Sequence, residues 1–350
     1  MRLENSIQIG GVASEIPANV VTAMQALAAG RTDSEDVTRV GVDCLPASAE
    51  HSGPQLAACA AEKALRAAGW DASSLDMLIH AWVHHQGHDF WSPAHYVADT
   101  IGAGRAVPVG VQQMCNGAAS GIEIAAARLT GDPRTSRALV TTGDRFADEG
   151  FDRWRGDYGV WYGDGGTACL LQRNENDCVG LPLLLAIASR AIPEVESLHR
   201  GVDAFTPAAR WLGPIVDVRR TKKGFIEARG LAAFYTASHA ALRGVVTDAM
   251  ADAGLEMDDE RVSVLTVPRV GRAVIAETYV PALEGLTKAQ VTFTGQRTGH
   301  LGAGDLIANI DLVLSSQLWD AGDIGLFVSA GGGFTFSCAV VQFGSGGRDE

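Results

Sequence analysis

The sequence predicts an α/β fold, in which helices cover a sheet, and three observations support this class. Runs typical of buried strands alternate along the chain with helical patterns. The 350 residues, 47% of them hydrophobic, suffice for a large core. Two Gly-rich turns, within residues 165–172 and 333–342, each lead into a strand that carries Cys and then Gln. This internal echo favours a duplicated architecture, although two short apolar strands can also resemble one another by chance.

The individual elements follow from local periodicity. Short runs rich in apolar and β-branched residues predict strands at residues 77–81, 138–142, 262–267 and 324–329. Apolar residues at helical spacing predict helices at residues 55–68, 117–130, 228–253 and 305–320. The echo divides the chain into halves, residues 1–178 and 179–350.

Composition excludes several classes of function. A formal net charge of −13 disfavours a nucleic-acid partner, because phosphates would be repelled. No apolar run is long enough for a membrane span, and the first residues lack a signal peptide, so we expect a cytoplasmic protein. The six cysteines form no C-x-x-C pair, which fits reduced thiols better than disulfides or zinc. The histidines at positions 80, 84, 85, 88 and 95 share no helical face, so no metal site is expected.

Cys115 stands where an apolar strand ends and a helix of small residues begins. The first N–H groups of a helix are unpaired and carry partial positive charge, so a cysteine there becomes a better thiolate. Its own N–H could also face an oxyanion. The competing interpretation is that Cys115 is one more small buried apolar residue.

A possible base lies in a Gly-rich loop near residue 300. His300 is flanked by glycines that permit a tight turn, and Asp305 follows five residues later at the start of a helix. A histidine oriented by a carboxylate can act as a general base toward a thiol or an acceptor. Alternatively, His300 is an ordinary loop residue and Asp305 a helix cap.

Together these residues resemble the thiolase superfamily, and specifically β-ketoacyl-ACP synthase III. The resemblance rests on five ordered motifs, Met-Cys-Asn-Gly around Cys115 among them, at residues 9–17, 114–117, 162–168, 299–304 and 331–341. It implies a duplicated thiolase fold with five layers, α/β/α/β/α, and a homodimer. It further implies that Cys115 accepts the acyl group, and that the N–H groups of Cys115 and Gly332 form an oxyanion hole.

Two departures from the family pattern bear on the reaction. Condensing members use Cys, His and Asn, but Arg269 stands at their histidine position and His300 replaces their asparagine. The paired neutral donors that hold an enolate are therefore lost. A set of Cys115, His300 and Asp305 instead suits acyl transfer to oxygen, nitrogen or sulfur, and resembles the ketosynthase-III-like acyltransferases of polyketide and glycosylated antibiotic biosynthesis. The alternatives are a decarboxylative synthase and a catalytically silent partner subunit.

This hypothesis assigns partners and further residues. We expect no permanently bound cofactor, a CoA or phosphopantetheine thioester as donor substrate, and a small molecule or carrier protein as acceptor. The cationic run of residues 218–225 predicts either a dock for the donor or a solvated surface turn; its charges are Arg219, Arg220, Lys222 and Lys223.

The remaining candidates depend on where the resemblance places them. Trp82, Phe90 and Trp91 are expected to shape the cavity near the dimer seam. Arg269 is expected to bind a carboxylate or phosphate, or to form an internal ion pair. The other cysteines are expected to be structural; they are Cys44, Cys59, Cys169, Cys178 and Cys338.

Overall fold

The computed structural model describes residues 1–3, 6–174, 180–316 and 319–344. Cys178 and the expected boundary between residues 178 and 179 lie outside these ranges, so the division of the chain at that point stays a prediction. In the described part of the chain no helix is both long and apolar enough to cross a membrane.

Ten strands of the described residues pair in one hydrogen-bonded order, β10-β9-β11-β12-β8-β1-β7-β6-β4-β5. The first set comprises β1 (Ile7–Glu15), β4 (Met77–Ala81), β5 (Val107–Val111), β6 (Arg137–Asp144) and β7 (Gly165–Arg173). The second set comprises β8 (Leu183–Ala191), β9 (Val262–Thr266), β10 (Val291–Thr292), β11 (Ile324–Gly331) and β12 (Thr335–Gln342). The sets meet where Gln8 of β1 pairs with Leu183 of β8.

The two sets repeat one topology. In each, the first strand neighbours the last, followed by the fourth, second and third. The directions also agree, because β4 pairs in parallel with β5 and β6 as β9 does with β10 and β11, while the remaining pairs are antiparallel. The echoed segments, β7 and β12, occupy equivalent positions. A shared topology of this detail supports duplication over chance similarity.

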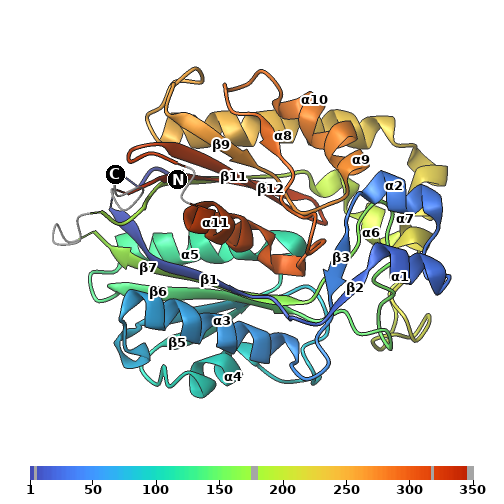
Figure 1. The fold of residues 1–350 in the computed structure, drawn as a ribbon, viewed down its shortest axis with the longest axis horizontal. Coiled ribbons are helices and arrows are strands. Elements are labelled where there is room, and N and C mark those ends of the chain that lie inside the picture. The colour runs from blue at the N-terminus through green and yellow to red at the C-terminus, as the bar shows by residue number, and fades with distance from the viewer. Residues whose placement is uncertain (4–5, 175–179, 317–318, 345–350) are drawn as a thin grey trace.

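Helices separate and cover the two sets of strands (Figure 1). Helices α3 (Gly53–Ala68) and α4 (Pro93–Thr100) pack on the outer side of the first set, and α8 (Ala232–Asp252) packs on the outer side of the second. Between them lie α5 (Gly117–Gly131) and α11 (Asp305–Ser316), which contact each other and both sets. The five layers α/β/α/β/α are therefore confirmed. The small residues of α5 allow this burial, since a Cβ on Gly121 would lie 2.8 Å from Val140.

Shorter elements complete the chain. A second sheet pairs β2 (Val20–Thr22) with β3 (Cys44–Pro46). The other α-helices are α1 (Ala23–Ala28), α2 (Ser34–Val40), α6 (Ser197–Arg200), α7 (Val218–Arg229), α9 (Arg272–Val274) and α10 (Val280–Leu283). Single turns of other helix types lie at η1 (Ala72–Ser74), η2 (Met114–Asn116), η3 (Pro193–Val195), η4 (Ile275–Tyr279) and η5 (Gly302–Gly304).

Two predicted helices differ from the structure. The helix expected at residues 228–253 is two helices, because Gly230, with φ +72°, ends α7 before α8 begins. In the helix expected at residues 305–320, Asp305–Ser316 are helical, and Trp319 and Asp320 are not.

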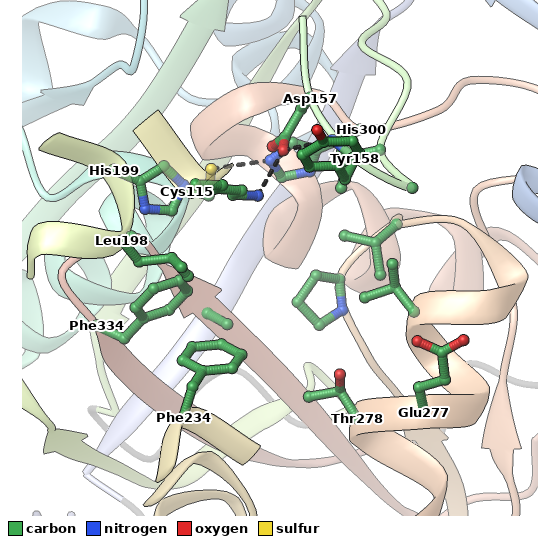
Figure 2. A pocket seen from close by; sticks show the side chains of 18 of the residues that line it. Cys115, Asp157, Tyr158, Leu198, His199, Phe234, Glu277, Thr278, His300 and Phe334 are labelled. Atoms are coloured by element: carbon green, nitrogen blue, oxygen red, sulfur yellow. Dashed lines mark hydrogen bonds and ion pairs between the residues drawn. The ribbon is translucent and has the colours of Figure 1, made fainter. Parts of the chain in front are cut away.

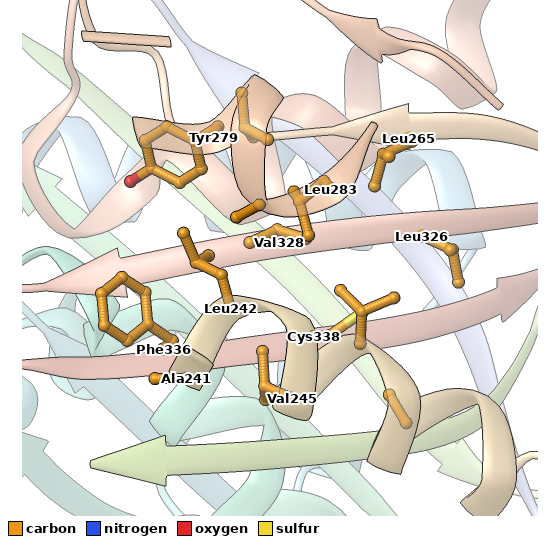
Figure 3. Close-up of a cluster of buried hydrophobic side chains, with 14 of the residues drawn as sticks. Ala241, Leu242, Val245, Leu265, Tyr279, Leu283, Leu326, Val328, Phe336 and Cys338 are labelled. Carbon is orange, nitrogen blue, oxygen red and sulfur yellow. The ribbon is translucent and has the colours of Figure 1, made fainter. Parts of the chain in front are cut away.

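Packing of α8 on the second set forms a large hydrophobic cluster (Figure 3). Leu242 and Val245 of α8 lie against Phe336 and Cys338 of β12. Full burial of a Leu, Val or Phe side chain stabilises the fold by about 1.5–3 kcal/mol. Burial raises the pKa of Cys338 to about 12, and that of Cys169 in β7 likewise. Both thiols therefore stay protonated and pack as small apolar groups, as expected.

Candidate active site

Cys115 lies in a tight turn, η2, between β5 and α5. The residue before it, Met114, has φ +49°, a conformation that non-glycine residues rarely adopt. Asn116 fixes the turn, because its side-chain amide donates to Gln113 (2.7 Å) and to Ser337 of β12 (2.9 Å). Gly331 allows close approach, since a Cβ there would lie 2.6 Å from the Asn116 nitrogen. The end of β11 thus holds Cys115 at the N-terminus of α5.

His300 reaches Cys115 from the second half of the chain. Its Nε2 lies 2.9 Å from the Cys115 sulfur, and its Nδ1 lies 2.5 Å from Oδ2 of Asp305. The loop depends on Gly299 and Gly302, which have φ +61° and +62°. A Cβ on Gly302 would lie 2.2 Å from the Asp144 carboxylate. Only glycine permits this path, which brings Cys115, His300 and Asp305 into contact. Figure 2 shows the contact between Cys115 and His300.

Asp305 is held by three N–H groups. Its Oδ2 accepts from His300 and from the Arg269 backbone (2.7 Å), and its Oδ1 accepts from the Leu301 backbone (2.8 Å). Burial raises the pKa of Asp305, but the charge and hydrogen bond of His300, with the charge of Arg269, bring it below its usual range. The carboxylate therefore stays ionised beside the imidazole.

The pKa of His300 moves in the opposite direction. Burial alone lowers it, but the Asp305 carboxylate, the Cys115 sulfur and the hydrogen bonds to both raise it well above its ordinary value. A histidine stabilised in its protonated form readily takes a proton from a thiol. The geometry therefore suits a nucleophilic cysteine with a base that a carboxylate orients.

A cavity of about 420 Å³ opens onto Cys115 and His300. Much of its lining is apolar, as Leu198, Phe234 and Phe334 show in Figure 2. Gly332 also lines it, on the same side as the cysteine turn. The oxyanion role of the Cys115 and Gly332 N–H groups stays a prediction.

One wall of this cavity is polar, and no local sequence pattern predicts it. Asp157, which is 2% exposed, accepts a hydrogen bond from Tyr162 (2.9 Å) and pairs with Lys222 of α7 (2.5 Å). The Tyr162 ring packs edge-on against His300, with centroids 5.1 Å apart. His199 of α6 lies on the same wall. Tyr162 belongs to a motif of the family resemblance, but no local pattern connects these four residues, which only tertiary packing brings together.

Arg269 does not line the cavity. Its buried guanidinium donates to Asn309 (2.8 Å) and Thr298 (3.0 Å), while its backbone holds Asp305. The expectation that it binds a ligand carboxylate or phosphate is therefore wrong for this chain's cavity. The alternative was an internal ion pair, but the described contacts of the guanidinium are with the neutral Asn309 and Thr298, while the Arg269 charge favours the ionised form of Asp305.

The three aromatic residues within the histidine-rich segment 80–95 lie outside the cavity lining. Trp82 stacks on His80 and covers Gly110 of β5, while Trp91 packs on Tyr96. Phe90 is fully exposed. Within one chain, Trp82, Phe90 and Trp91 therefore do not shape the cavity.

The cationic run is helix α7 rather than a turn, and its charges are mostly paired. Arg219 binds Asp36 and the backbone of Asp157, and Arg220 binds Asp203. Lys222 pairs with Asp157 inside the cavity, while the exposed Lys223 lies 3.9 Å from Glu227. Because a nearby carboxylate accompanies each charge, the run is not a free cationic patch, and a docking role stays untested.

Among the described residues, no three His, Cys, Asp or Glu side chains gather closely enough to hold a metal ion. His80 is fully buried and hydrogen-bonds Thr141 and Gln86. His84 stacks on Phe146. These two histidines serve packing.

Comparisons with known proteins agree with this architecture. Residues 109–189 match the family model of 3-oxoacyl-[acyl-carrier-protein] synthase III, and residues 250–343 match the model of its C-terminal part. Beta-ketoacyl-[acyl-carrier-protein] synthase III of Erythrobacter litoralis is 26% identical over 96% of this chain and 98% of its own length.

Solved structures extend the similarity. ChlB3, described as an acyltransferase, is 29% identical, with a TM-score of 0.88 over 98% of this chain and 99% of its own. The synthase III of Aquifex aeolicus shares the fold, with 20% identity and a TM-score of 0.76 over 96% of this chain and 100% of its own. The chain therefore belongs to the 3-oxoacyl-ACP synthase III family, with the thiolase fold.

Proposed function

We propose that this protein is an acyltransferase that moves an acyl group from a CoA or acyl-carrier-protein thioester, through an acyl-Cys115 intermediate, to an oxygen, nitrogen or sulfur acceptor. The observation that carries the proposal is the continuous contact from the Cys115 sulfur through His300 to Asp305. This arrangement pairs a nucleophile with an oriented base, as acyl transfer in two half-reactions requires.

In the first half-reaction, Cys115 gives its proton to Nε2 of His300 and attacks the thioester carbonyl. The N–H groups of Cys115 and Gly332 would hold the oxyanion of the tetrahedral intermediate. The intermediate collapses when the carbon–sulfur bond to the donor breaks. The departing thiolate takes the proton from His300, and the acyl group remains on Cys115.

In the second half-reaction, the neutral His300 accepts the proton of the acceptor as its oxygen, nitrogen or sulfur attacks the acyl-Cys115 carbonyl. The bond to Cys115 breaks, and its thiolate regains the proton. Asp305 stabilises the imidazolium in both half-reactions and fixes which ring nitrogen faces the reaction.

A second candidate is decarboxylative condensation, which the family models and the Erythrobacter relative favour by name. Condensation needs two neutral donors toward an enolate oxygen. Here Arg269 is buried outside the cavity and engaged with Asn309 and Thr298, and the pKa of His300 is raised, which disfavours a neutral donor. The site therefore supports acyl transfer better than condensation.

Measurement of CO₂ release separates the two candidates. The acyl-enzyme is formed with a donor thioester and then mixed with malonyl-ACP or with a panel of alcohols, amines and thiols. Acyl transfer discharges the enzyme to a member of the panel without CO₂. Release of one CO₂ per acyl group from malonyl-ACP would establish condensation instead, and Cys115→Ala is the matched blank.

The wider context follows from the same resemblance. We place the reaction in the cytoplasmic biosynthesis of a polyketide or glycosylated antibiotic, catalysed by a homodimer without a permanently bound cofactor. The likeness to ChlB3 supports the acyltransferase assignment. Sedimentation equilibrium at the concentration of the activity assay tests the dimer.

A further inference from the structure

His199 brings unused hydrogen-bonding capacity to the cavity. Its ring lines the cavity, yet neither ring nitrogen bonds another described residue, and Nδ1 is completely buried. Buried polar groups in proteins nearly always have a partner. Since Nδ1 is enclosed by protein, Nε2 is the nitrogen left to meet a ligand.

Lys222 adds further donors to the same wall. An ammonium group has three N–H donors, and Asp157 is its one hydrogen-bond partner among the described residues. The Lys222 side chain is 16% exposed, although it is part of the cavity lining. Two donors therefore remain for a ligand in the cavity.

These groups lie close to the position of the acyl carbon. A Cβ on Gly332 would lie 2.8 Å from the His199 ring. Gly332 follows Gly331, which packs against the turn that carries Cys115. Figure 2 shows His199 and Cys115 on the same side of the cavity. A substituent a few atoms from the carbonyl of an acyl-Cys115 therefore meets this wall, whereas the rest of the chain meets apolar residues such as Phe334.

The charge of the wall decides which substituent fits. The ammonium of Lys222 is neutralised by Asp157. Burial, with the charge of Lys222, lowers the pKa of His199 to about 4, so its ring is neutral at pH 7. A carboxylate that entered the cavity would lose its hydration, and the one cation that the structure describes on this wall is already paired with Asp157. Binding of a carboxylate here is therefore unfavourable. A hydroxyl or keto oxygen loses less hydration free energy on burial and can form hydrogen bonds with both His199 and Lys222.

We propose that the acyl group carried by Cys115 bears a neutral hydroxyl or keto oxygen near its carbonyl, which hydrogen-bonds His199 and Lys222. The proposal rests on the proposed function, because it names the substrate class of the same acyl-enzyme. An acyl group without such an oxygen would give His199 and Lys222 no hydrogen-bond partner. Sites built for a hydrogen bond discriminate strongly against analogues that lack it.

The test compares donors that differ in one oxygen. 3-Hydroxybutyryl, butyryl and malonyl groups are offered both as CoA thioesters and on an acyl carrier protein, and the rate of mass gain on Cys115 is measured at limiting donor. We expect 3-hydroxybutyryl to acylate at least about tenfold faster than butyryl. His199→Phe and Lys222→Met should each reduce this ratio to about threefold or less.

Lys223→Met is the matched control, since Lys223 is the next residue of α7 and lies outside the cavity lining. Its ratio of the 3-hydroxybutyryl rate to the butyryl rate should equal that of the wild type. The ratio is measured within one protein, so a general loss of activity cancels. If Lys222→Met fails to fold, the wild-type ratio and His199→Phe still decide.

The outcomes separate two failures. If butyryl and 3-hydroxybutyryl both acylate the wild type at equal rates, this inference alone is overturned. A preference for malonyl, or an unchanged ratio of the two rates in both His199→Phe and Lys222→Met, would overturn it as well. Absence of an adduct from every donor would overturn the proposed function, and this inference with it.

Discussion

Replacement of Asp305 by asparagine tests the role of the carboxylate behind His300. The two carboxylate oxygens accept three N–H groups, from His300, Leu301 and the backbone of Arg269. An asparagine has a single acceptor oxygen, so its NH₂ group must face at least one of these donors. If the NH₂ group faces His300, the ring must accept at Nδ1, and its Nε2 then carries the proton and cannot act as a base toward an acceptor.

The expected size of the rate loss follows from the carboxylate charge that Asp305→Asn removes. Removal of one partner of a buried ion pair costs about 3–5 kcal/mol, and each 1.36 kcal/mol changes a rate tenfold. Discharge of the acyl-enzyme in Asp305→Asn should therefore slow by about 10²- to 10⁴-fold. Rapid-quench measurement of discharge to a saturating acceptor gives this rate directly.

The pH dependence provides a second readout. Asp305 raises the pKa of His300, and discharge needs the neutral imidazole, so the rate rises with pH through that pKa. In Asp305→Asn this rise should move to lower pH, because the stabilising carboxylate is gone. Asp311→Asn, on the same helix, is the matched control. A rate within threefold of the wild type and an unmoved pH profile would refute the assigned role of Asp305.

Three further changes test how the structure supports the site. Arg269→Met loses the hydrogen bonds to Asn309 and Thr298, so the free energy of unfolding should fall by about 2–4 kcal/mol in urea, with the donor KM unchanged within about twofold. A tenfold higher KM at normal stability would instead indicate a ligand contact. Gly302→Ala places a Cβ at φ +62° against Asp144 and should cost at least about 2 kcal/mol, whereas Gly254→Ala, at φ +72° with open space, should pay only the smaller backbone cost. Burial lowers the pKa of His80 to about 4 from 6.5, so its contribution to stability is complete above pH 6.5 and is lost as pH falls toward 4. Between pH 7 and pH 5, His80→Gln should therefore lose about 2 kcal/mol less stability than the wild type, and equal losses would show that His80 is not responsible.

The sequence predicted the parts of the site that local patterns encode. A strand that turns into a small-residue helix at Cys115 and a Gly-rich loop before a helix at Asp305 are short-range signals, and the structure brings Cys115, His300 and Asp305 together. The break between α7 and α8 was missed, although Gly230 marks it, because apolar spacing continues through that position.

Contacts between distant segments could not be predicted. Asp157 and Lys222 are 65 residues apart, and nothing near either indicates the other. Arg269 was predicted to bind a carboxylate or phosphate, or to form an internal ion pair, but its side chain hydrogen-bonds Asn309, 40 residues later. The specificity of the cavity is therefore a property of the folded chain, whereas the proposed nucleophile and base, Cys115 and His300, are visible in the sequence.

Intact-mass spectrometry of the acyl-enzyme tests the central claim most directly. The wild type, Cys115→Ala and His300→Ala are exposed to acyl-CoAs and acyl carrier proteins, and their masses are followed before and after addition of acceptors. We expect an acyl mass on the wild type that acceptors remove, a lasting acyl mass on His300→Ala, and none on Cys115→Ala. An adduct that persists in Cys115→Ala, or no adduct on the wild type from any donor, would contradict an acyltransferase that works through Cys115.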